Sequence, residues 1–287
     1  MIHQRADLLP YGRHPNRAPT IEENRMNAPL TSAPRIECSS EEWEARVDLA
    51  CAYRAVSQMG WHHSIIYNHI SSRVPGTKSH FLINPFGLMY HEITASNLLK
   101  VDIDGNKLMP SPHPVLMAGF VVHRSIHMAR EDAHSVIHTH SKAGVAVACQ
   151  KQGLLPINLG AMHLHDKIAY YDVQGVTNDT EESDEIAKAL GSKNVAILRN
   201  HGLLTCGPTM GHAFHLMRRL ESACETQVMA QAGGAELIFP PMDVIRKTSQ
   251  QTTQIVQKKD IDTSDGPAML WTAMRRWMAQ IDPSYMQ

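Results

Sequence analysis

Short apolar stretches typical of β-strands alternate with segments of helical periodicity over residues 38–235. This interleaved order shows no break in composition, which favours one α/β domain whose helices cover a sheet. A capping box at Ser39 and Glu42 marks the start of the first helix. The pattern predicts helices at 40–59, 115–130, 143–150, 181–190, 209–232 and 268–278, and strands at 65–73, 81–83, 101–103, 133–140, 157–159, 167–171, 195–198 and 203–206.

The chain divides into three parts on either side of this domain. Residues 1–37 are rich in proline and poor in apolar residues, so we expect a disordered N-terminal tail. Residues 38–235 form the interleaved domain, and residues 236–287 form a C-terminal extension with a terminal helix. Trp271, Trp277 and Tyr285 are expected to dock this extension on the core or on a neighbouring subunit.

Charge and hydropathy narrow the class of protein. The 27 basic and 28 acidic residues give a net charge of -1, so the chain lacks the positive field with which proteins bind nucleic acid. No apolar run approaches the roughly 18 to 20 residues of a membrane span, and no secretory signal begins the chain. Five scattered cysteines suit buried thiols in a reducing compartment. We therefore expect a cytoplasmic protein that binds neither nucleic acid nor membranes.

Histidine is unusually frequent, at 18 of 287 residues, and three histidines could converge. His138 and His140 are two residues apart in a predicted strand, so their side chains leave the same face. His201 lies in an Asn200-His201-Gly202 turn between two apolar strands, where it could supply a third ligand. Three neutral imidazoles with an open position suit a catalytic divalent metal. The alternative for His138 and His140 is a hydrogen-bonded pair without a metal.

An ordered set of motifs within about residues 40–234 resembles the class II aldolase/adducin family. The motifs are Phe81-Leu82-Ile83-Asn84-Pro85-Phe86-Gly87, Glu92-Ile93-Thr94-Ala95-Ser96, His138-Thr139-His140 and Leu198-Arg199-Asn200-His201-Gly202-Leu203. The resemblance implies a three-layer α/β/α domain with a mostly antiparallel central sheet, usually assembled as a homotetramer. It also implies a divalent metal on His138, His140 and His201, typically Zn2+, with Fe2+, Mn2+ and Co2+ left open.

Two departures from the sugar-phosphate aldolases of this family bear on the substrate. Their catalytic glutamate lies on the helix before the His-x-His strand, and gapless counting places Gly119 there. Their phosphate cradle includes a Gly-Asn pair before a Ser and an Arg, whereas Asn68 and His69 precede Ser71 and Arg73 here. The side chains of Asn68 and His69 would fill space meant for a phosphate. We therefore expect a small, unphosphorylated substrate, with Asn68, Ser71 and Arg73 as its binding residues.

Another residue must then supply the acid/base group that Gly119 lacks. His163 and His165 fall near the position of a tyrosine that some family members take from a neighbouring subunit. His69 is a third candidate, and histidine is an effective acid or base near neutral pH.

The roles of Glu92 and of two histidines in a predicted helix are open to more than one interpretation. Glu92 is either a carboxylate near the metal or a residue that holds the turn before Thr94, and turn chemistry favours the structural role. His123 and His127 are one helical turn apart, and we expect one of them to support the metal site indirectly.

The motifs resemble the adducin branch most, notably in Tyr67-Asn68-His69-Ile70 and Ala118-Gly119-Phe120. Animal adducins carry a long basic tail that binds the actin cytoskeleton, whereas only isolated pairs such as Arg275-Arg276 and Lys258-Lys259 occur here. With the metal ligands intact, we expect a metal-dependent lyase, of aldolase or decarboxylase type, that cleaves a hydroxy-carbonyl compound through a stabilised enolate. The alternatives are a non-haem Fe(II) oxygenase on the same histidines and a non-catalytic adducin-like interaction module.

Overall fold

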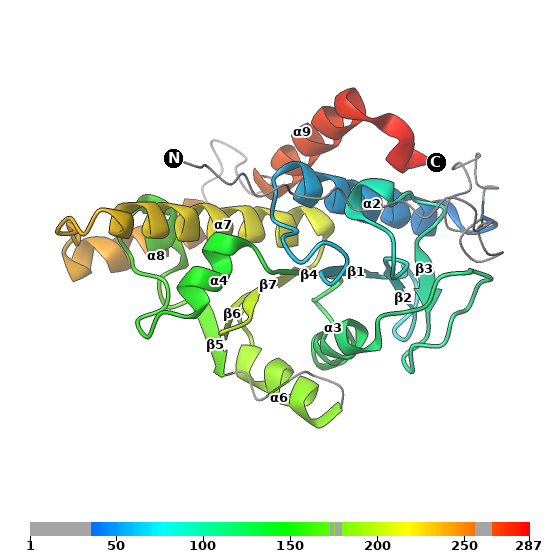
Figure 1. The fold of residues 1–287 in the computed structure, drawn as a ribbon, viewed down its shortest axis with the longest axis horizontal. Helices are drawn as coiled ribbons and strands as arrows, with labels where there is room; N and C mark the ends of the chain where they lie inside the picture. The colour runs from blue at the N-terminus through cyan, green and yellow to red at the C-terminus, as the bar shows by residue number, and fades with distance from the viewer. Residues whose placement is uncertain (1–35, 173–174, 176–179, 256–265) are drawn as a thin grey trace, which may run out of the picture. The chain divides into compact units, whose positions relative to one another are not determined.

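A computed structural model describes residues 36–172, 175, 180–255 and 266–287 (Figure 1). Almost all of the predicted N-terminal tail, residues 1–37, lies outside the described residues, as do Lys258 and Lys259 of the C-terminal extension. The described residues from Ile36 to Gln287 lie in one compact unit.

The described residues form a seven-stranded sheet in the order β3-β2-β1-β4-β7-β6-β5. Only β5 and β6 pair in parallel, and the other neighbouring strands are antiparallel. The prediction of a mostly antiparallel sheet is therefore confirmed. The strands are β1 His69–Arg73, β2 Phe81–Ile83, β3 Leu99–Val101, β4 Ser135–Thr139, β5 Ile168–Asp172, β6 Val195–Arg199 and β7 Gly202–Gly207.

Helices cover both faces of this sheet, as the three-layer prediction requires. In Figure 1, α2, α7 and α9 lie on one side of the strands and α3 and α6 on the other. Within the described residues, no helix is both long enough and apolar enough to cross a membrane. The helices are α2 Ser40–Gln58, α3 Met117–Ala129, α4 Lys142–Ala148, α5 Leu159–Leu164, α6 Thr180–Leu190, α7 Met210–Ala232, α8 Met242–Ile255 and α9 Gly266–Ile281, with 3-10 helices η1 Tyr90–Glu92 and η3 Pro283–Met286.

Alternating strand residues supply the two larger of the three buried apolar clusters among the described residues. Ile137 and Leu203 pack in the larger core with α2, α7 and α9, whereas Val136 and Leu204 pack in the smaller core with α3 and α6. This alternation follows from the two-residue period of a strand. His138, two residues after Val136, therefore lies on the face of the sheet that α3 covers.

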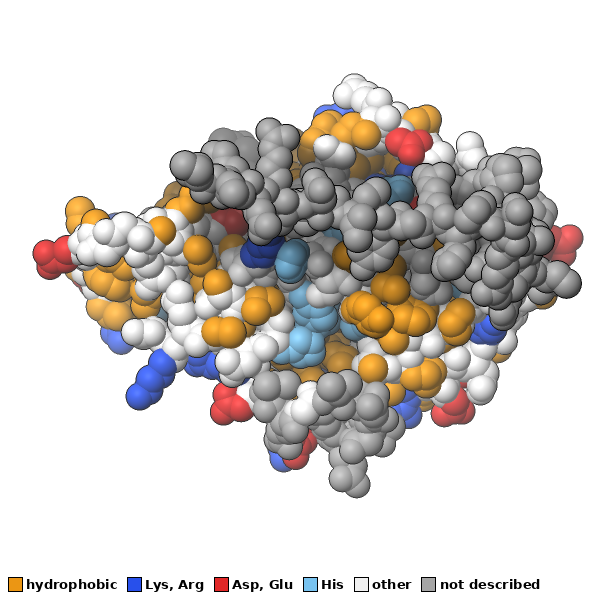
Figure 2. Space-filling model, viewed as in Figure 1, with side chains coloured by type: hydrophobic (Ala, Val, Ile, Leu, Met, Phe, Trp, Pro, Cys, Tyr) orange, Lys and Arg blue, Asp and Glu red, His pale blue; other side chains and the backbone are white. Residues whose placement is uncertain are grey.

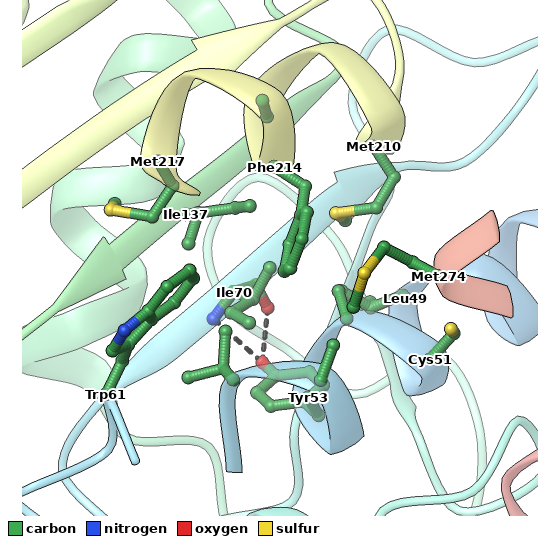
Figure 3. Close-up of a cluster of buried hydrophobic side chains, with 14 of the residues drawn as sticks. Leu49, Cys51, Tyr53, Trp61, Ile70, Ile137, Met210, Phe214, Met217 and Met274 are labelled. Atoms are coloured by element: carbon green, nitrogen blue, oxygen red, sulfur yellow. Dashed lines mark hydrogen bonds between the residues drawn. The ribbon is translucent and has the colours of Figure 1, made fainter. Parts of the chain in front are cut away.

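The larger core joins distant parts of the chain around Tyr53 (Figure 3). The Tyr53 hydroxyl accepts the backbone N–H of Ile70 at 2.9 Å and donates to the carbonyl of the same residue, which ties α2 to β1. Trp271 and Tyr285 are buried in this core, as predicted, while Trp277 remains 39% exposed. The extension thus docks on the domain through Trp271 and Tyr285.

Three local predictions were wrong. The strand predicted at 101–103 lies instead at Leu99–Val101, because the chain turns at Asp102, whose side chain accepts the N–H groups of Asp104 and Asn106. Residues 157–159 do not form a strand, because the Asn158 side chain accepts the N–H of Ala161 at 2.8 Å and starts α5. The strand predicted from residue 65 begins only at His69, since Ile65 adopts a left-handed conformation with φ of 60° in the preceding turn. Helix α8 was not predicted, because its sequence is mostly polar, although its few apolar residues gather on one side of the helix.

Candidate metal centre

The strand β4 brings the first two candidate ligands together. His138 pairs across the sheet with His69 on β1 and with Leu204 on β7. His140 follows just after the strand, and its Nε2 atom lies 2.8 Å from Nε2 of His138. The predicted same-face placement of the two rings is therefore confirmed.

The turn between β6 and β7 adds the third ring. Asn200 takes the left-handed conformation, with φ of 58°, and His201 follows with Nε2 3.3 Å from Nε2 of His138. A Cβ atom on Gly202 would stand 2.4 Å from the Thr139 carbonyl oxygen and 2.9 Å from Cδ2 of His140. Glycine at position 202 therefore lets the turn approach β4 closely enough for the rings to converge.

Hydrogen bonds on the far side of two rings orient these nitrogens. Nδ1 of His138 donates to the carbonyl of Leu203 at 2.8 Å, so its Nε2 carries a lone pair. Nδ1 of His140 lies 2.8 Å from the Ser64 hydroxyl, and its backbone N–H donates to the Asn68 side chain at 3.0 Å. The Asn68 side chain, which was predicted to bind substrate, thus accepts a hydrogen bond from the backbone of a candidate metal ligand.

Burial keeps the His138 and His140 rings neutral. Burial, followed by the neighbouring His140 and His201 rings, lowers the pKa of His138 well below its ordinary range. Burial also lowers the pKa of His140 to about 4. Neutral imidazole is the form that binds a metal, so protons compete little at ordinary pH.

These residues fit a divalent ion. The three ring nitrogens lie within 4.8 Å of one another, and among the described residues this is the group of His, Cys, Asp or Glu side chains that could hold a metal. Nitrogens about 2.0 to 2.1 Å from a tetrahedral zinc ion stand about 3.3 Å apart, close to the His138 to His201 separation. All-nitrogen ligation suits zinc and also iron, copper or nickel.

The rings border a cavity of about 460 Å³. Figure 2 shows histidine side chains gathered in a hollow near the centre of the visible face, with hydrophobic side chains beside them. The described residues that line the cavity are Tyr67, His69, Leu116, Ala118, Gly119, Val122, His138, His140, Gly175, Asn200 and His201.

His69 occupies the space beside Gly119. A Cβ atom on Gly119 would lie 2.2 Å from both Nε2 and Cδ2 of His69, so the imidazole stands where a side chain at position 119 would begin. The ring stacks on His138 with a centroid separation of 5.6 Å. This contact places His69, a predicted acid/base candidate, next to the metal ligands.

The structure does not bring Ser71 and Arg73 to the cavity. The Ser71 hydroxyl is buried between His123 and His127 at 2.6 and 2.8 Å. The Arg73 guanidinium donates to backbone carbonyls of Lys78, His127 and Arg130. Both side chains are therefore committed to protein groups, which does not suit the predicted substrate contacts.

Three catalytic candidates also lie outside the described lining of this cavity. The Glu92 carboxylate accepts the Met89 N–H at 2.7 Å, in keeping with its structural reading. His165 lines a different cavity and lies 3.5 Å from Asp166. Burial, followed by the nearby Arg219 and Lys167, lowers the pKa of His163 on α5.

Glu221 is a buried residue that the sequence analysis missed. Its two carboxylate oxygens accept the hydroxyls of Thr139 at 2.6 Å and Ser141 at 2.5 Å, on either side of His140. Burial raises its pKa to about 7. The signal available in the sequence was a glutamate directly after Leu220 on the apolar face of α7.

The sequence of this chain matches the profile of a known protein family. The profile of the Class II Aldolase and Adducin N-terminal domain matches residues 47–228, and the chain belongs to this family. A Pseudomonas aeruginosa protein provisionally named as an aldolase class 2 protein is 45% identical over 88% of this chain and 95% of its own length. Alpha-adducin of Mus musculus is 45% identical over 67% of this chain and 26% of its own length.

Solved structures agree with the assignment. An aldolase II superfamily protein from Pseudomonas syringae has a TM-score of 0.81 and 44% identity, covering 88% of this chain and 98% of its own. L-fuculose 1-phosphate aldolase from Glaciozyma antarctica has a TM-score of 0.72 and 25% identity, covering 86% and 94%. The predicted family and its α/β fold are therefore confirmed.

Proposed function

We propose that this protein is a divalent-metal-dependent lyase, of aldolase or decarboxylase type, acting on a small hydroxy-carbonyl compound. The observation that carries the proposal is the convergence of the Nε2 atoms of His138, His140 and His201 at the wall of a cavity. When bound, a divalent ion would act as a Lewis acid that stabilises negative charge developing on a substrate oxygen. We propose Zn2+ as this ion, with Fe2+, Mn2+ or Co2+ as substitutes.

His69 is the proposed acid/base. Of the four predicted catalytic candidates, it is the one that lines the cavity in the described part of the chain. Its ring stands over Gly119, in the place that sequence counting gave to the glutamate of the sugar-phosphate aldolases. In this proposal, His69 takes a proton from a substrate hydroxyl as the neighbouring carbon–carbon bond breaks and returns one to the product.

The proposed substrate carries no phosphate. No lysine or arginine is among the described residues that line the cavity, so that part of the wall offers no cationic side chain for a phosphate. Arg73, the predicted cation, instead binds backbone carbonyls. Leu116, Ala118 and Val122 give one wall an apolar character that suits a compact organic substituent.

We also propose that the protein assembles as a homotetramer and acts in the cytoplasm on small molecules, without a nucleic-acid partner. The oligomer is supported by the family and by exposed apolar side chains such as Ile238, which is 88% exposed, and Phe239, which is 52% exposed. Light scattering of the purified protein tests the assembly directly, and a stable monomer would contradict it.

Metal analysis after anaerobic purification is the first test of the lyase. We expect one divalent ion per subunit, lost in His201→Ala and kept in His212→Ala, whose ring belongs to α7 and bonds Thr209. Bound iron with dioxygen-dependent turnover would favour the oxygenase instead. Absence of any bound metal would favour the non-catalytic adducin-like module.

A substrate screen then tests the chemistry. Phosphorylated and unphosphorylated hydroxy-keto acids and aldols should be compared, and efficient turnover of fuculose 1-phosphate or ribulose 5-phosphate would overturn the unphosphorylated class. Because the His69 ring fills the space at residue 119, Gly119→Glu alone should clash. A double variant, Gly119→Glu with His69→Gly, is the fair test of restored aldolase chemistry.

A further inference from the structure

A chain of buried polar groups runs behind His69, between β1 and α3. It consists of Ser71 on β1 and His123 and His127 on α3, with exposed fractions of 1%, 0% and 1%. The Ser71 hydroxyl lies 2.6 Å from Nδ1 of His123 and 2.8 Å from Nε2 of His127. Nδ1 of His127 lies 2.7 Å from the carbonyl of Ala133, where the chain ends. Nothing in the metal site requires this arrangement for ligation.

The terminal carbonyl determines the direction of every proton in this chain. A carbonyl can only accept, so Nδ1 of His127 is the protonated nitrogen. Burial lowers the pKa of both His123 and His127 to about 3, so each ring is neutral and carries one proton. Nε2 of His127 must then accept from the Ser71 hydroxyl, and Ser71 must accept from Nδ1 of His123. Nε2 of His123 is left with a lone pair.

The His123 ring lies beside the ring of His69. The two rings meet edge to face, with centroids 5.5 Å apart. Nε2 of His123 and Nδ1 of His69 are both buried and have no hydrogen-bond partner among the described groups. If Nδ1 of His69 also carried a lone pair, two buried acceptors would lie in neighbouring rings without a donor, which is unfavourable. A proton on Nδ1 of His69 instead places a donor beside the acceptor Nε2 of His123.

We infer that the His127–Ser71–His123 chain fixes His69 as the tautomer protonated on Nδ1, so that its Nε2 lone pair accepts a hydrogen bond from a hydroxyl group of the ligand. Nε2 is the ring nitrogen that stands over Gly119, at the cavity wall. The ligand part of this inference rests on the proposed function. The tautomer itself does not, since it is argued from the hydrogen bonds of the chain and from the contact between the His123 and His69 rings.

The inference narrows the substrate class. A ligand that offers a hydroxyl donor toward His69 is matched, whereas one that offers a carbonyl or carboxylate oxygen there would meet a lone pair. The cavity should therefore select hydroxy compounds over their oxidised or deoxy counterparts. Ser71, which the sequence assigned to substrate binding, becomes a positioning residue that acts through His123.

Neutron diffraction from crystals of the full-length, zinc-loaded protein in D2O tests the tautomer, because deuterons are seen directly. We expect deuterons on Nδ1 of His69, His123 and His127, and none on Nε2 of His69. A deuteron on Nε2 of His69, with Nδ1 bare, would overturn the inference. The proposed function could fail, with no metal-dependent turnover found, while this map still supports the tautomer.

Matched serine variants test the chain in solution. Ser71→Ala removes the central hydroxyl, while Ser72→Ala removes a buried neighbour whose hydroxyl lies 3.2 Å from that of Ser135 instead. Calorimetry with glycolate and acetate as probes gives a ratio of affinities that reports hydroxyl recognition. We expect this ratio to fall about fivefold to tenfold in Ser71→Ala and to be unchanged in Ser72→Ala. An equal ratio in wild type and Ser71→Ala would contradict hydroxyl recognition, and if Ser71→Ala fails to fold, the wild-type neutron map decides.

Discussion

Glu221→Gln should remove a large part of the pH dependence of stability in this protein. Glu221 is fully buried, and its carboxylate accepts one hydroxyl on each oxygen, from Thr139 and Ser141. Two hydroxyl donors do not repay the desolvation of the charge, because burial raises the pKa of this group to about 7. Glutamine has the same shape and stays neutral at every pH, so the substitution isolates the ionisation.

The magnitude follows from that pKa. Raising it from the ordinary 4.5 to about 7 corresponds to about 3 kcal/mol of unfolding free energy. The native state holds the proton more tightly than the unfolded chain does. The contribution to stability is therefore complete below pH 4.5 and is lost as the pH rises through about 7.

Urea unfolding of both proteins between pH ~4 and ~8 measures the effect, with Glu236→Gln as an exposed control. Wild type should lose about 3 kcal/mol more than Glu221→Gln over the full titration, while the control should follow wild type. Other titrating groups cancel in this comparison. If wild type and Glu221→Gln lose the same free energy, the carboxylate is not the buried acid described here.

Three further predictions concern the metal turn, the docked extension and the ion. Gly202→Ala should lose about 1 to 3 kcal/mol of stability and most of its bound metal, because the new Cβ atom would stand 2.4 Å from a carbonyl oxygen. In the control variant Gly233→Ala, the new Cβ atom meets nothing within 4 Å, so stability and metal content should not change. Metal content and melting temperature are measured for both variants. Trp271→Ala should cost about 3 to 5 kcal/mol in urea unfolding, and Trp277→Ala, at an exposed site, less than about 0.5. Chelation of the ion should lower the melting temperature, and equal values with and without a chelator would argue against a resident metal.

The metal ligands were predictable by two routes. Residues two apart in a strand must share a face, so the placement of His138 beside His140 is local. The approach of His201 depends on the pairing of β4 with β7, and it was predicted through the resemblance to the family. Whether an ion occupies the convergence stays a prediction.

The surroundings of the ligands were not predictable, because helix packing decides them. Whether Ser71 faces a substrate or a helix depends on where α3 docks, and α3 brings His123 and His127 onto its hydroxyl. Glu221 likewise reaches β4 from α7, about eighty residues away in sequence. Such contacts leave no periodic pattern in the sequence, because each involves a single polar residue on an otherwise apolar face of its helix.

The relation between His69 and Gly119 shows how such distant positions constrain each other. Considered alone, each residue would be expected to impair a sugar-phosphate aldolase site. Gly119 lacks the catalytic carboxylate, and His69 places a bulky ring on a strand next to the site. In the structure the two changes fit each other, because the absent side chain at position 119 makes the room that the His69 ring fills. An anionic side chain is thereby exchanged for an imidazole that stacks on His138. The exchange leaves the cavity with His69, the proposed acid/base, but alters the charge of the cavity. This change in charge is the physical basis for expecting a different substrate from that of the sugar-phosphate aldolases.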